Sequence, residues 1–189
     1  GILKLSNGIG IENVPFAATS VAEEVTRVRP TGRVLHTTQH RWREKTFLSD
    51  SGFPVAPFRR VTSLEELRAA AGALGFPAVL KTTGFGYDGK GQIKLRDEAD
   101  LAMAWQRLGG VEAICEAFVQ FEKEISVIGA RTSNGEFAAF PVFENRHTNH
   151  ILDVTFAPAI LSDRLTREAT DLAAGILEEL TVVGLLTVE

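Results

Sequence analysis

Residues 81–92 read KTTGFGYDGKGQ and place four glycines between two short apolar segments. Positions 84–90 match the G-x-x-x-x-G-K pattern of a phosphate-binding P-loop, which continues with Ser or Thr and opens a helix. Here Gly91 follows, and the next residues, QIKLR, alternate between polar and apolar as a strand does. The pattern therefore excludes a P-loop and predicts a glycine-rich hairpin that joins a strand at 76–82 to a strand at 92–96.

Two interpretations of this hairpin remain open: a plain solvent-facing turn, and a lid over a phosphate chain. The loop is longer than the roughly two to five residues that plain hairpins use. It carries Lys90 near Asp88, and a glycine-rich backbone can present amide groups to an anion without a helix. Lys81 ends the preceding strand, either as an ordinary strand-end lysine or as a second phosphate ligand. Together the two lysines favour a nucleotide site.

The rest of the sequence alternates short strands with amphipathic helices. Ser63 and Glu66 form a capping box that starts a helix closed by Gly75, and Ser162 can cap a long helix with apolar residues at spacings of three and four. Further helices are predicted at 38–48 and 97–110, and further strands at 113–119, 122–131, 136–145 and 182–189. This order predicts an α+β fold of mainly antiparallel sheets with helices on one side.

Composition excludes several classes of protein. The net charge is −4, whereas nucleic-acid-binding domains usually carry a basic face. Cys115 is the only cysteine, which excludes a disulfide framework, and its apolar neighbours indicate an inert buried thiol. No run approaches the ~18 consecutive apolar residues that a membrane span needs. We therefore expect a soluble cytoplasmic protein that binds neither nucleic acid nor a membrane.

Six segments, in order along residues 11–189, resemble signatures of ATP-grasp enzymes. They are IENVP, QHRWREKTFLSDSGFPVAPF, VLKTTGFGYDGKGQ, EAFVQFEKEISVIGAR, FPVFENRHTNHILDVTFAPA and VGLLTVE. Within that superfamily they are similar to the N5-carboxyaminoimidazole ribonucleotide synthetases of purine biosynthesis. The resemblance implies an ATP-grasp fold, in which two α/β subdomains clasp ATP. It also implies a remnant of a Rossmann-like N-terminal domain at 1–35 and an ATP-grasp domain at 36–189, with a lid subdomain at about 55–115.

The resemblance implies a ligase that carboxylates 5-aminoimidazole ribonucleotide with bicarbonate through carboxyphosphate. ATP and Mg²⁺ would be used, ADP and phosphate would be released, and a homodimer is expected. The hairpin would act as a lid that keeps water away from the labile mixed anhydride. Two alternatives stay open: another ATP-grasp ligase or transformylase, and a non-catalytic nucleotide-binding fragment.

Matched position by position, the resemblance also assigns site residues. Nucleotide contacts fall on Arg41, Lys81, Gly86, Tyr87, Asp88, Gly89, Lys90, Gly91, Gln92, Glu116, Ala117, Phe118, Val119, Glu124 and His147. Of these, residues 116–119 would meet the adenine through alternate backbone groups, and Glu124 would bind the ribose hydroxyls. Glu189 would be the first magnesium ligand. Tyr87, Asp88 and Arg131 would act on the substrates.

The sequence departs from this family in two respects. His40 stands where the family usually has Asp, which bears on local packing. Most of the N-terminal domain and the segment with the second metal-binding glutamate do not occur in the sequence, and the last predicted strand runs to Glu189. We therefore expect the chain to be a fragment with an incomplete metal site.

Overall fold

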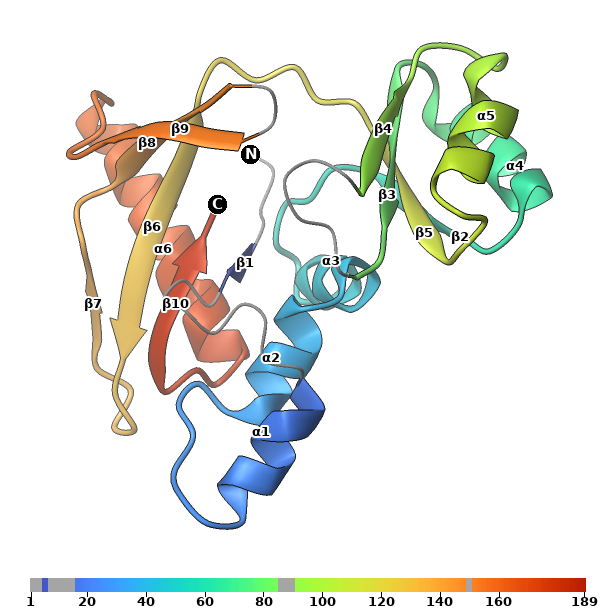
Figure 1. Ribbon diagram of the computed structural model, residues 1–189. Helices are drawn as coiled ribbons and strands as arrows, with labels where there is room; N and C mark the ends of the chain where they lie inside the picture. The colour runs from blue at the N-terminus through green and yellow to red at the C-terminus, as the bar shows by residue number, and fades with distance from the viewer. Residues whose placement is uncertain (1–4, 7–15, 85–90, 149–150) are drawn as a thin grey trace.

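The computed structural model describes residues 5–6, 16–84, 91–148 and 151–189 (Figure 1). Its helices are α1 (Phe16–Glu23), α2 (Gly32–Thr38), α3 (Arg41–Asp50), α4 (Leu64–Leu74), α5 (Asp100–Arg107) and α6 (Asp163–Glu179). Its strands are β1 (Leu5–Ser6), β2 (Phe58–Val61), β3 (Ala78–Thr82), β4 (Gln92–Leu95), β5 (Ala113–Ala117), β6 (Glu124–Arg131), β7 (Phe137–Ala139), β8 (Phe143–Thr148), β9 (Ile151–Phe156) and β10 (Gly184–Val188). Every pairing between these described strands is antiparallel. The predicted α+β class with mainly antiparallel sheets is therefore confirmed.

The smaller sheet, sheet B, contains four strands in the order β2-β5-β3-β4. β3 and β4 are the two strands of the predicted hairpin: Lys81 pairs with Gln92, and the Thr82 amide donates to the Gly91 carbonyl at 2.9 Å. Helices α4 and α5 cover one face of this sheet (Figure 1). The core on that face includes Val61, Leu67, Leu80, Leu95 and Cys115. The opposite face carries Lys81 and Glu116 together with the apolar Phe58 and Ile114.

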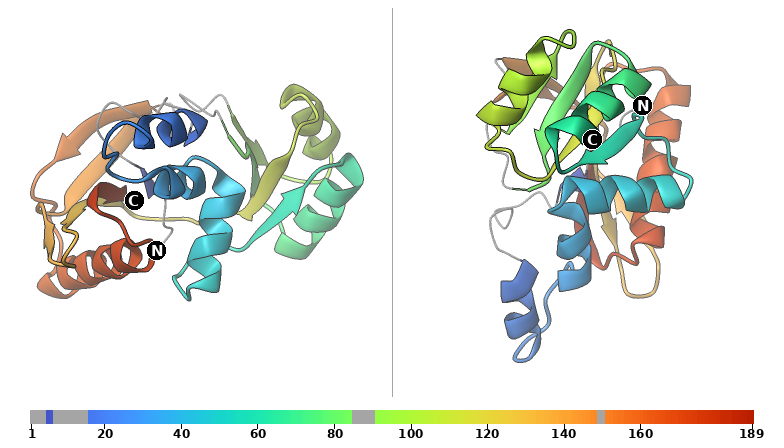
Figure 2. Two further views of the ribbon diagram at one scale, coloured as in Figure 1. Left: turned by 90° about the horizontal axis from the view of Figure 1, so that it is seen from below. Right: turned by 90° about the vertical axis from the view of Figure 1, so that its right-hand side faces the viewer.

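The larger sheet, sheet A, follows the order β1-β10-β6-β8-β9, with β7 paired to the far end of β6. The long helix α6 lies along one face of it, as Figures 1 and 2 show. Its core includes Val127, Ile176, Leu177, Leu186 and Val188. Leu48 of α3 also belongs to this core, so α3 packs on sheet A while its other side contacts sheet B.

Both helix caps predicted from the sequence are confirmed. The Ser63 hydroxyl accepts a hydrogen bond from the Glu66 amide at 3.1 Å, and the Glu66 carboxylate accepts from the Thr62 amide at 2.6 Å. The Ser162 hydroxyl accepts from the Leu165 amide at 3.3 Å. The two serine bonds satisfy amides that the first turn of a helix leaves without partners, and the Glu66 bond ties α4 to the residue before its cap.

The helix predicted at 38–48 is wrong in its first turn. α2 ends at Thr38, His40 has an extended backbone, and α3 starts only at Arg41. The reason is a contact far along the chain, since the Arg41 amide donates to the Thr83 carbonyl at 2.8 Å. An amide inside a helix is already bonded to the carbonyl four residues earlier. The Arg41 amide can therefore make this bond only if the helix begins at Arg41.

The strand predicted at 136–145 is interrupted, and two strands, β1 and β9, were not predicted. Ser126 pairs with Phe143 but Gly129 pairs with Ala139, so one extra residue lies on the β7–β8 side between these pairs. The interruption contains Pro141, which has no amide for the ladder. β9 pairs with β8 at the edge of sheet A, where its six residues are all exposed, so its sequence has no buried face to reveal it.

The N-terminal assignments remain predictions. IENVP at 11–15 lies outside the described residues, and the proposed boundary after residue 35 falls within α2. Among the described residues, no helix has both the length and the apolar character needed to cross a bilayer.

Replacing Leu177 with Ala should lower the free energy of unfolding by about 2–5 kcal/mol, because the change removes buried methyl groups and leaves a cavity. Leu177 is fully buried under sheet A, whereas Leu165 on the same helix is 39% exposed. Leu165→Ala is therefore a matched control, with an expected change of about 0.5 kcal/mol or less. Urea denaturation followed by circular dichroism measures both, and equal losses would contradict the assigned packing of α6.

Candidate functional site

Two basic residues of α3 point toward sheet B. Arg41 and Lys45 are four residues apart, so they share one side of the helix. The Arg41 guanidinium donates to the Thr82 carbonyl at 2.6 Å, in addition to its amide bond with Thr83. Burial lowers the pKa of this guanidinium, and nearby carboxylates oppose the shift. Arg41 thus fixes the end of β3, where the glycine-rich segment begins.

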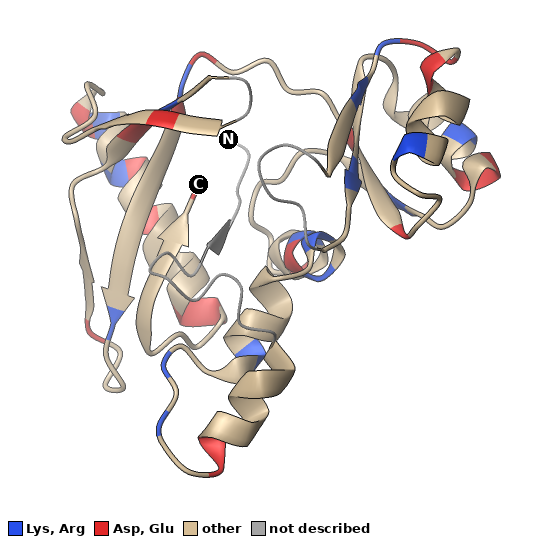
Figure 3. Cartoon of the chain, viewed as in Figure 1, with Lys and Arg blue, Asp and Glu red and all other residues tan. Residues whose placement is uncertain are grey.

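A buried carboxylate lies between two lysines beside Arg41. Glu116 of β5 has a side chain that is only 4% exposed; its Oε2 is 2.9 Å from Lys81 Nζ and its Oε1 is 3.5 Å from Lys45 Nζ. Burial lowers the pKa of the Lys45 ammonium, and the Glu116 carboxylate opposes this shift. The three side chains form the Lys45–Glu116–Lys81 cluster, which carries a net charge of +1 and suits an anionic ligand. Figure 3 shows basic residues both on α3 and on the strands of sheet B beside it.

The sequence reasoning missed Lys45. A signal for it existed, because Lys45 follows Arg41 by one helical turn within WREKTFL and therefore shares its side of the helix. What the pattern did not contain was the partner of Lys45. Glu116 is 71 positions further along the chain (116 − 45), and only the packing of α3 on β5 brings the two together.

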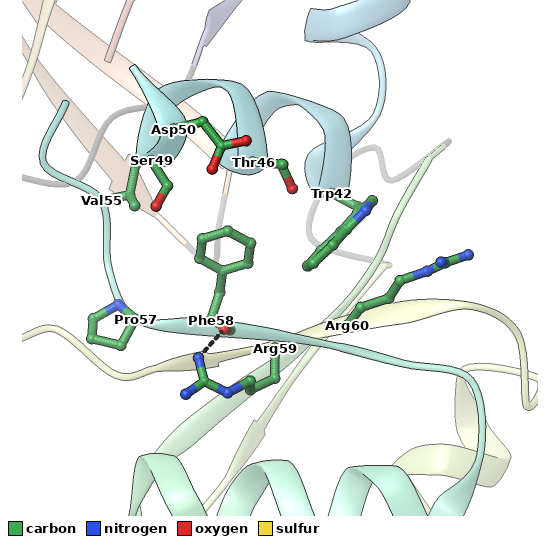
Figure 4. Close-up of a pocket in the computed structure, with 9 residues that line it drawn as sticks. All are labelled: Trp42, Thr46, Ser49, Asp50, Val55, Pro57, Phe58, Arg59 and Arg60. Atoms are coloured by element: carbon green, nitrogen blue, oxygen red, sulfur yellow. Dashed lines mark hydrogen bonds between the residues drawn. The ribbon is translucent and has the colours of Figure 1, made fainter. Parts of the chain in front are cut away.

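A groove lies between α3 and β2 (Figure 4). It measures about 400 Å³ and is lined by Trp42, Thr46, Ser49, Asp50, Val55, Pro57, Phe58, Arg59 and Arg60. The rings of Trp42 and Phe58 meet edge to face at 5.5 Å in its wall. None of the predicted nucleotide residues lines this groove, so it is a feature separate from the cluster.

The segment predicted to meet the adenine, residues 116–119, spans the end of β5 and the two residues after it. The Ala117 and Phe118 amides donate to the carbonyls of Pro57 and Pro77, at 2.9 and 3.2 Å. These two amides are thus used within the chain, and the predicted base contact falls on other backbone groups of residues 116–119. The Phe118 ring is 40% exposed, and the Lys94 ammonium lies over it at 3.8 Å. Phe118 therefore offers a flat apolar surface that a base could use.

On sheet A, polar side chains gather at one end of β6. Glu124 Oε2 and His147 Nδ1 form a pair at 2.8 Å, so the structure brings these two predicted site residues together. Beside them the Asn145 amide donates to the Ser126 hydroxyl at 2.9 Å and accepts from the Thr155 hydroxyl at 3.0 Å. These contacts hold the end of β6 and β8 in a fixed polar arrangement.

Glu189 comes next to this polar end. It follows Val188, which pairs with Val127 of β6, so its backbone lies level with Ser126. Within the described residues no group of three or more His, Cys, Asp or Glu side chains is arranged to hold a metal ion. The assignment of Glu189 as the first magnesium ligand stays a prediction.

Arg131 lies at the other end of β6 and donates to the Val182 carbonyl at 3.3 Å. Glu124 and Arg131 are the two ends of an eight-residue strand, roughly 23 Å apart at about 3.3 Å per residue. The structure therefore does not bring Arg131 together with Glu124, and the predicted role of Arg131 toward the substrates stays a prediction.

The central part of the predicted lid lies outside the described residues. This applies to Gly86, Tyr87, Asp88, Gly89 and Lys90, whose assigned contacts stay predictions. The two remaining lid residues, Gly91 and Gln92, pair with the end of β3 as the hairpin requires.

The chain matches the family model of the ATP-grasp domain over residues 46–189. It therefore belongs to the ATP-grasp family. Among curated relatives it is 41% identical to the N5-carboxyaminoimidazole ribonucleotide synthase of Brucella melitensis and 38% identical to that of Pseudomonas aeruginosa. Each match covers 94% of this chain and, respectively, 50% and 49% of the relative. The chain thus spans about half the length of these relatives.

A solved structure gives the same result. The ADP complex of an N5-carboxyaminoimidazole ribonucleotide synthetase superposes with a TM-score of 0.88 and is 40% identical, covering 94% of this chain and 47% of that one. The ATP-grasp fold expected from the sequence is confirmed.

Cys115 should be unreactive in the folded chain, because burial raises the pKa of its thiol to about 11. At pH 8 we expect labelling with Ellman's reagent to be roughly 100-fold slower than in the urea-unfolded chain, since a rise of two pKa units removes about that factor of thiolate. Rapid stoichiometric labelling of the folded chain would contradict the burial of β5 under α4 and α5.

Proposed function

We propose that the chain is the nucleotide-binding core of an N5-carboxyaminoimidazole ribonucleotide synthase. Such an enzyme uses ATP and bicarbonate to carboxylate the amine of 5-aminoimidazole ribonucleotide, releasing ADP and phosphate. The observation that carries the proposal is the Lys45–Glu116–Lys81 cluster directly before the glycine-rich segment, in a chain about 40% identical to these synthases along 94% of its length. Because the chain spans about half the length of these relatives, the reaction is itself part of what we propose for this chain.

The proposed phosphate contacts come from α3, the helix that contacts both sheets, and from β3. Lys45 and Lys81 present ammonium groups, and Arg41 holds the end of β3 so that Lys81 and the following lid begin from a fixed position. A lysine ammonium near a phosphate makes a charge-assisted hydrogen bond, about twice as strong as a neutral one. The lid residues 86–92 would close over the phosphates.

The proposed contacts to the nucleoside come from the segment after β5 and from β6. The exposed Phe118 ring would stack on the base, and Glu124 would accept hydrogen bonds from the ribose hydroxyls. His147 is bonded to Glu124, so it would orient that carboxylate toward the sugar. In this proposal, Glu124 binds the ribose and His147 orients Glu124, so both residues are needed.

Magnesium would supply charge neutralisation of the phosphates when bound. Mg²⁺ is usually held by one or two carboxylates together with waters and substrate phosphates. Glu189, beside the polar end of β6, fits one of these carboxylates.

The proposed reaction has two steps. A bicarbonate oxygen bonds to the γ-phosphorus of ATP, the bond from that phosphorus to the bridging oxygen breaks, and ADP leaves. The amine nitrogen of the ribonucleotide then bonds to the carboxyphosphate carbon, phosphate leaves with the electrons of the C–O bond, and the nitrogen gives up a proton. Tyr87 and Asp88 are proposed to contact the ribonucleotide. A closed lid would exclude water, which otherwise hydrolyses carboxyphosphate.

The test is ADP release from Mg-ATP and bicarbonate, measured with and without 5-aminoimidazole ribonucleotide. We expect release to depend on the ribonucleotide, with formation of its N5-carboxylate. ADP binding without any ribonucleotide-dependent turnover would identify a non-catalytic nucleotide-binding fragment, and turnover with another acceptor would identify a different ATP-grasp ligase.

A cytoplasmic location and a homodimer are proposed on the same resemblance, and the dimer is tested by sedimentation.

Lys81→Ala should weaken ADP binding by about 1.5–3 kcal/mol, because one charge-assisted contact is lost. Isothermal titration calorimetry measures the change, and circular dichroism checks that the variant folds. Arg107→Ala, in the last turn of α5 and away from the cluster, removes one positive charge as a control and should leave the affinity unchanged. Unchanged affinity in a folded Lys81→Ala variant would remove this residue from the site.

A further inference from the structure

The Glu116 carboxylate lies between two ammonium groups, those of Lys81 and Lys45. Its two oxygens are divided between them, with Oε2 on Lys81 and Oε1 on Lys45. A nucleotide-binding site with a net positive charge does not need a carboxylate there, and a carboxylate repels a phosphate. The presence of Glu116 at this point therefore requires an explanation beyond anion binding.

The contact between Lys45 and Glu116 is incomplete. Lys45 Nζ and Glu116 Oε1 are both buried, are 3.5 Å apart, and have no hydrogen-bond partner among the described residues. An ammonium has three donors, and a buried charged group with unmet donors is costly. An incoming phosphate oxygen would supply the missing acceptor for Lys45.

The contact with Lys81 is short but open to solvent. Lys81 Nζ lies 2.9 Å from Glu116 Oε2, and its side chain is 24% exposed against 4% for Glu116. The lysine side chain is flexible, while Glu116 is held in the central part of sheet B between β2 and β3. Lys81 can therefore change its partner from the carboxylate to a ligand without leaving the surface of the sheet.

We propose that Glu116 is an internal anion that competes with the nucleotide's phosphates for Lys45 and Lys81. Nucleotide binding exchanges carboxylate contacts for phosphate contacts, and release of ADP is assisted by the return of the carboxylate. Glu116 is thus a positioning residue: it acts through the lysines and sets the affinity and the exchange rate of the phosphates. This inference rests on the proposed nucleotide site and assigns to the side chain of Glu116 a role distinct from the predicted backbone contact with adenine.

The test compares three probes: ADP, inorganic pyrophosphate and adenosine, each titrated calorimetrically into the wild type and Glu116→Gln. Competition predicts that the variant binds ADP and pyrophosphate roughly five- to tenfold more tightly at pH 7.5, because a like charge a few ångströms from the phosphates is removed. Adenosine should bind equally to both proteins. ADP dissociation, followed by stopped flow, should slow by a similar factor.

Other roles for Glu116 give different results. If its carboxylate contacts the adenine amine, the variant loses affinity for ADP and adenosine but not for pyrophosphate. If it serves packing alone, all three probes are weakened alike or not at all. Either result overturns the proposal. Glu112→Gln is the matched control: Glu112 precedes the same strand, pairs with Arg60 at 2.9 Å in a partly exposed position, and should leave all three affinities unchanged.

A pH series gives a second readout that packing alone would not move. Three titratable groups face Lys45: Glu116 from β5, Lys81 from β3 and Glu44 from its own helix. Without Glu116 the Lys45 ammonium loses its proton at lower pH, and a cation binds phosphate only below its pKa. The gain in ADP affinity should therefore shrink as the pH rises above 7.5, where a phosphate ester stays ionised because its second pKa is about 6.

The double variant Lys45→Met/Glu116→Gln covers the case in which Glu116→Gln does not fold. Removing both members of a buried ion pair is often tolerated, whereas removing one leaves an uncompensated charge. With the net charge back at +1, the double variant should lose the gain in affinity, and a retained gain would overturn the proposal. Absence of ADP binding by the wild type would overturn the nucleotide site itself, whereas wild-type binding with unchanged variants would overturn only the competition.

Discussion

The contact on which the arrangement of this structure depends is the buried ion pair between Lys45 of α3 and Glu116 of β5. α3 is the helix that contributes to both halves of the chain. Leu48 packs in the core of sheet A, while Lys45 and Arg41 reach the uncovered face of sheet B. Removing one partner of a buried pair commonly costs about 3–5 kcal/mol, because the other charge stays buried without compensation. The same residues thus hold sheet B in position and present positive charge to a ligand.

Each sheet turns one face to the core beneath its helices, and the other face of sheet B carries Lys81 and Glu116 beside the apolar Phe58 and Ile114. In β3, Leu80 is fully buried under α4 and α5, and its neighbour Lys81 points to the opposite face. In β5, Cys115 lies in the core and Glu116 belongs to the Lys45–Glu116–Lys81 cluster. Because successive side chains of a strand alternate between faces, the core and the cluster are built from the same strands. A shift of one residue in the pairing of β3 with β5 would exchange them.

Local signals in the sequence were sufficient for many elements. The Ser63 and Ser162 caps start α4 and α6 where expected, since a hydroxyl satisfies an amide only a few residues away. The glycine-rich segment joins two strands as its flanking alternation indicated. The failures have non-local causes. The break at His40 follows from a bond between Arg41 and Thr83, and β9 is an exposed edge strand with no buried face to give it a period.

The sequence by itself determined the class of fold, the family, and most of the residues placed at the candidate site, because caps, alternation and motif spacing are properties of neighbouring residues. Only the tertiary structure decided which charges meet. It brought Lys45 to Glu116 and Glu124 to His147, and it put Arg131 at the far end of β6 from Glu124. The physical reason is that an ion pair needs two groups within a few ångströms. For residues far apart in the chain, that distance is set by the packing of helices and sheets.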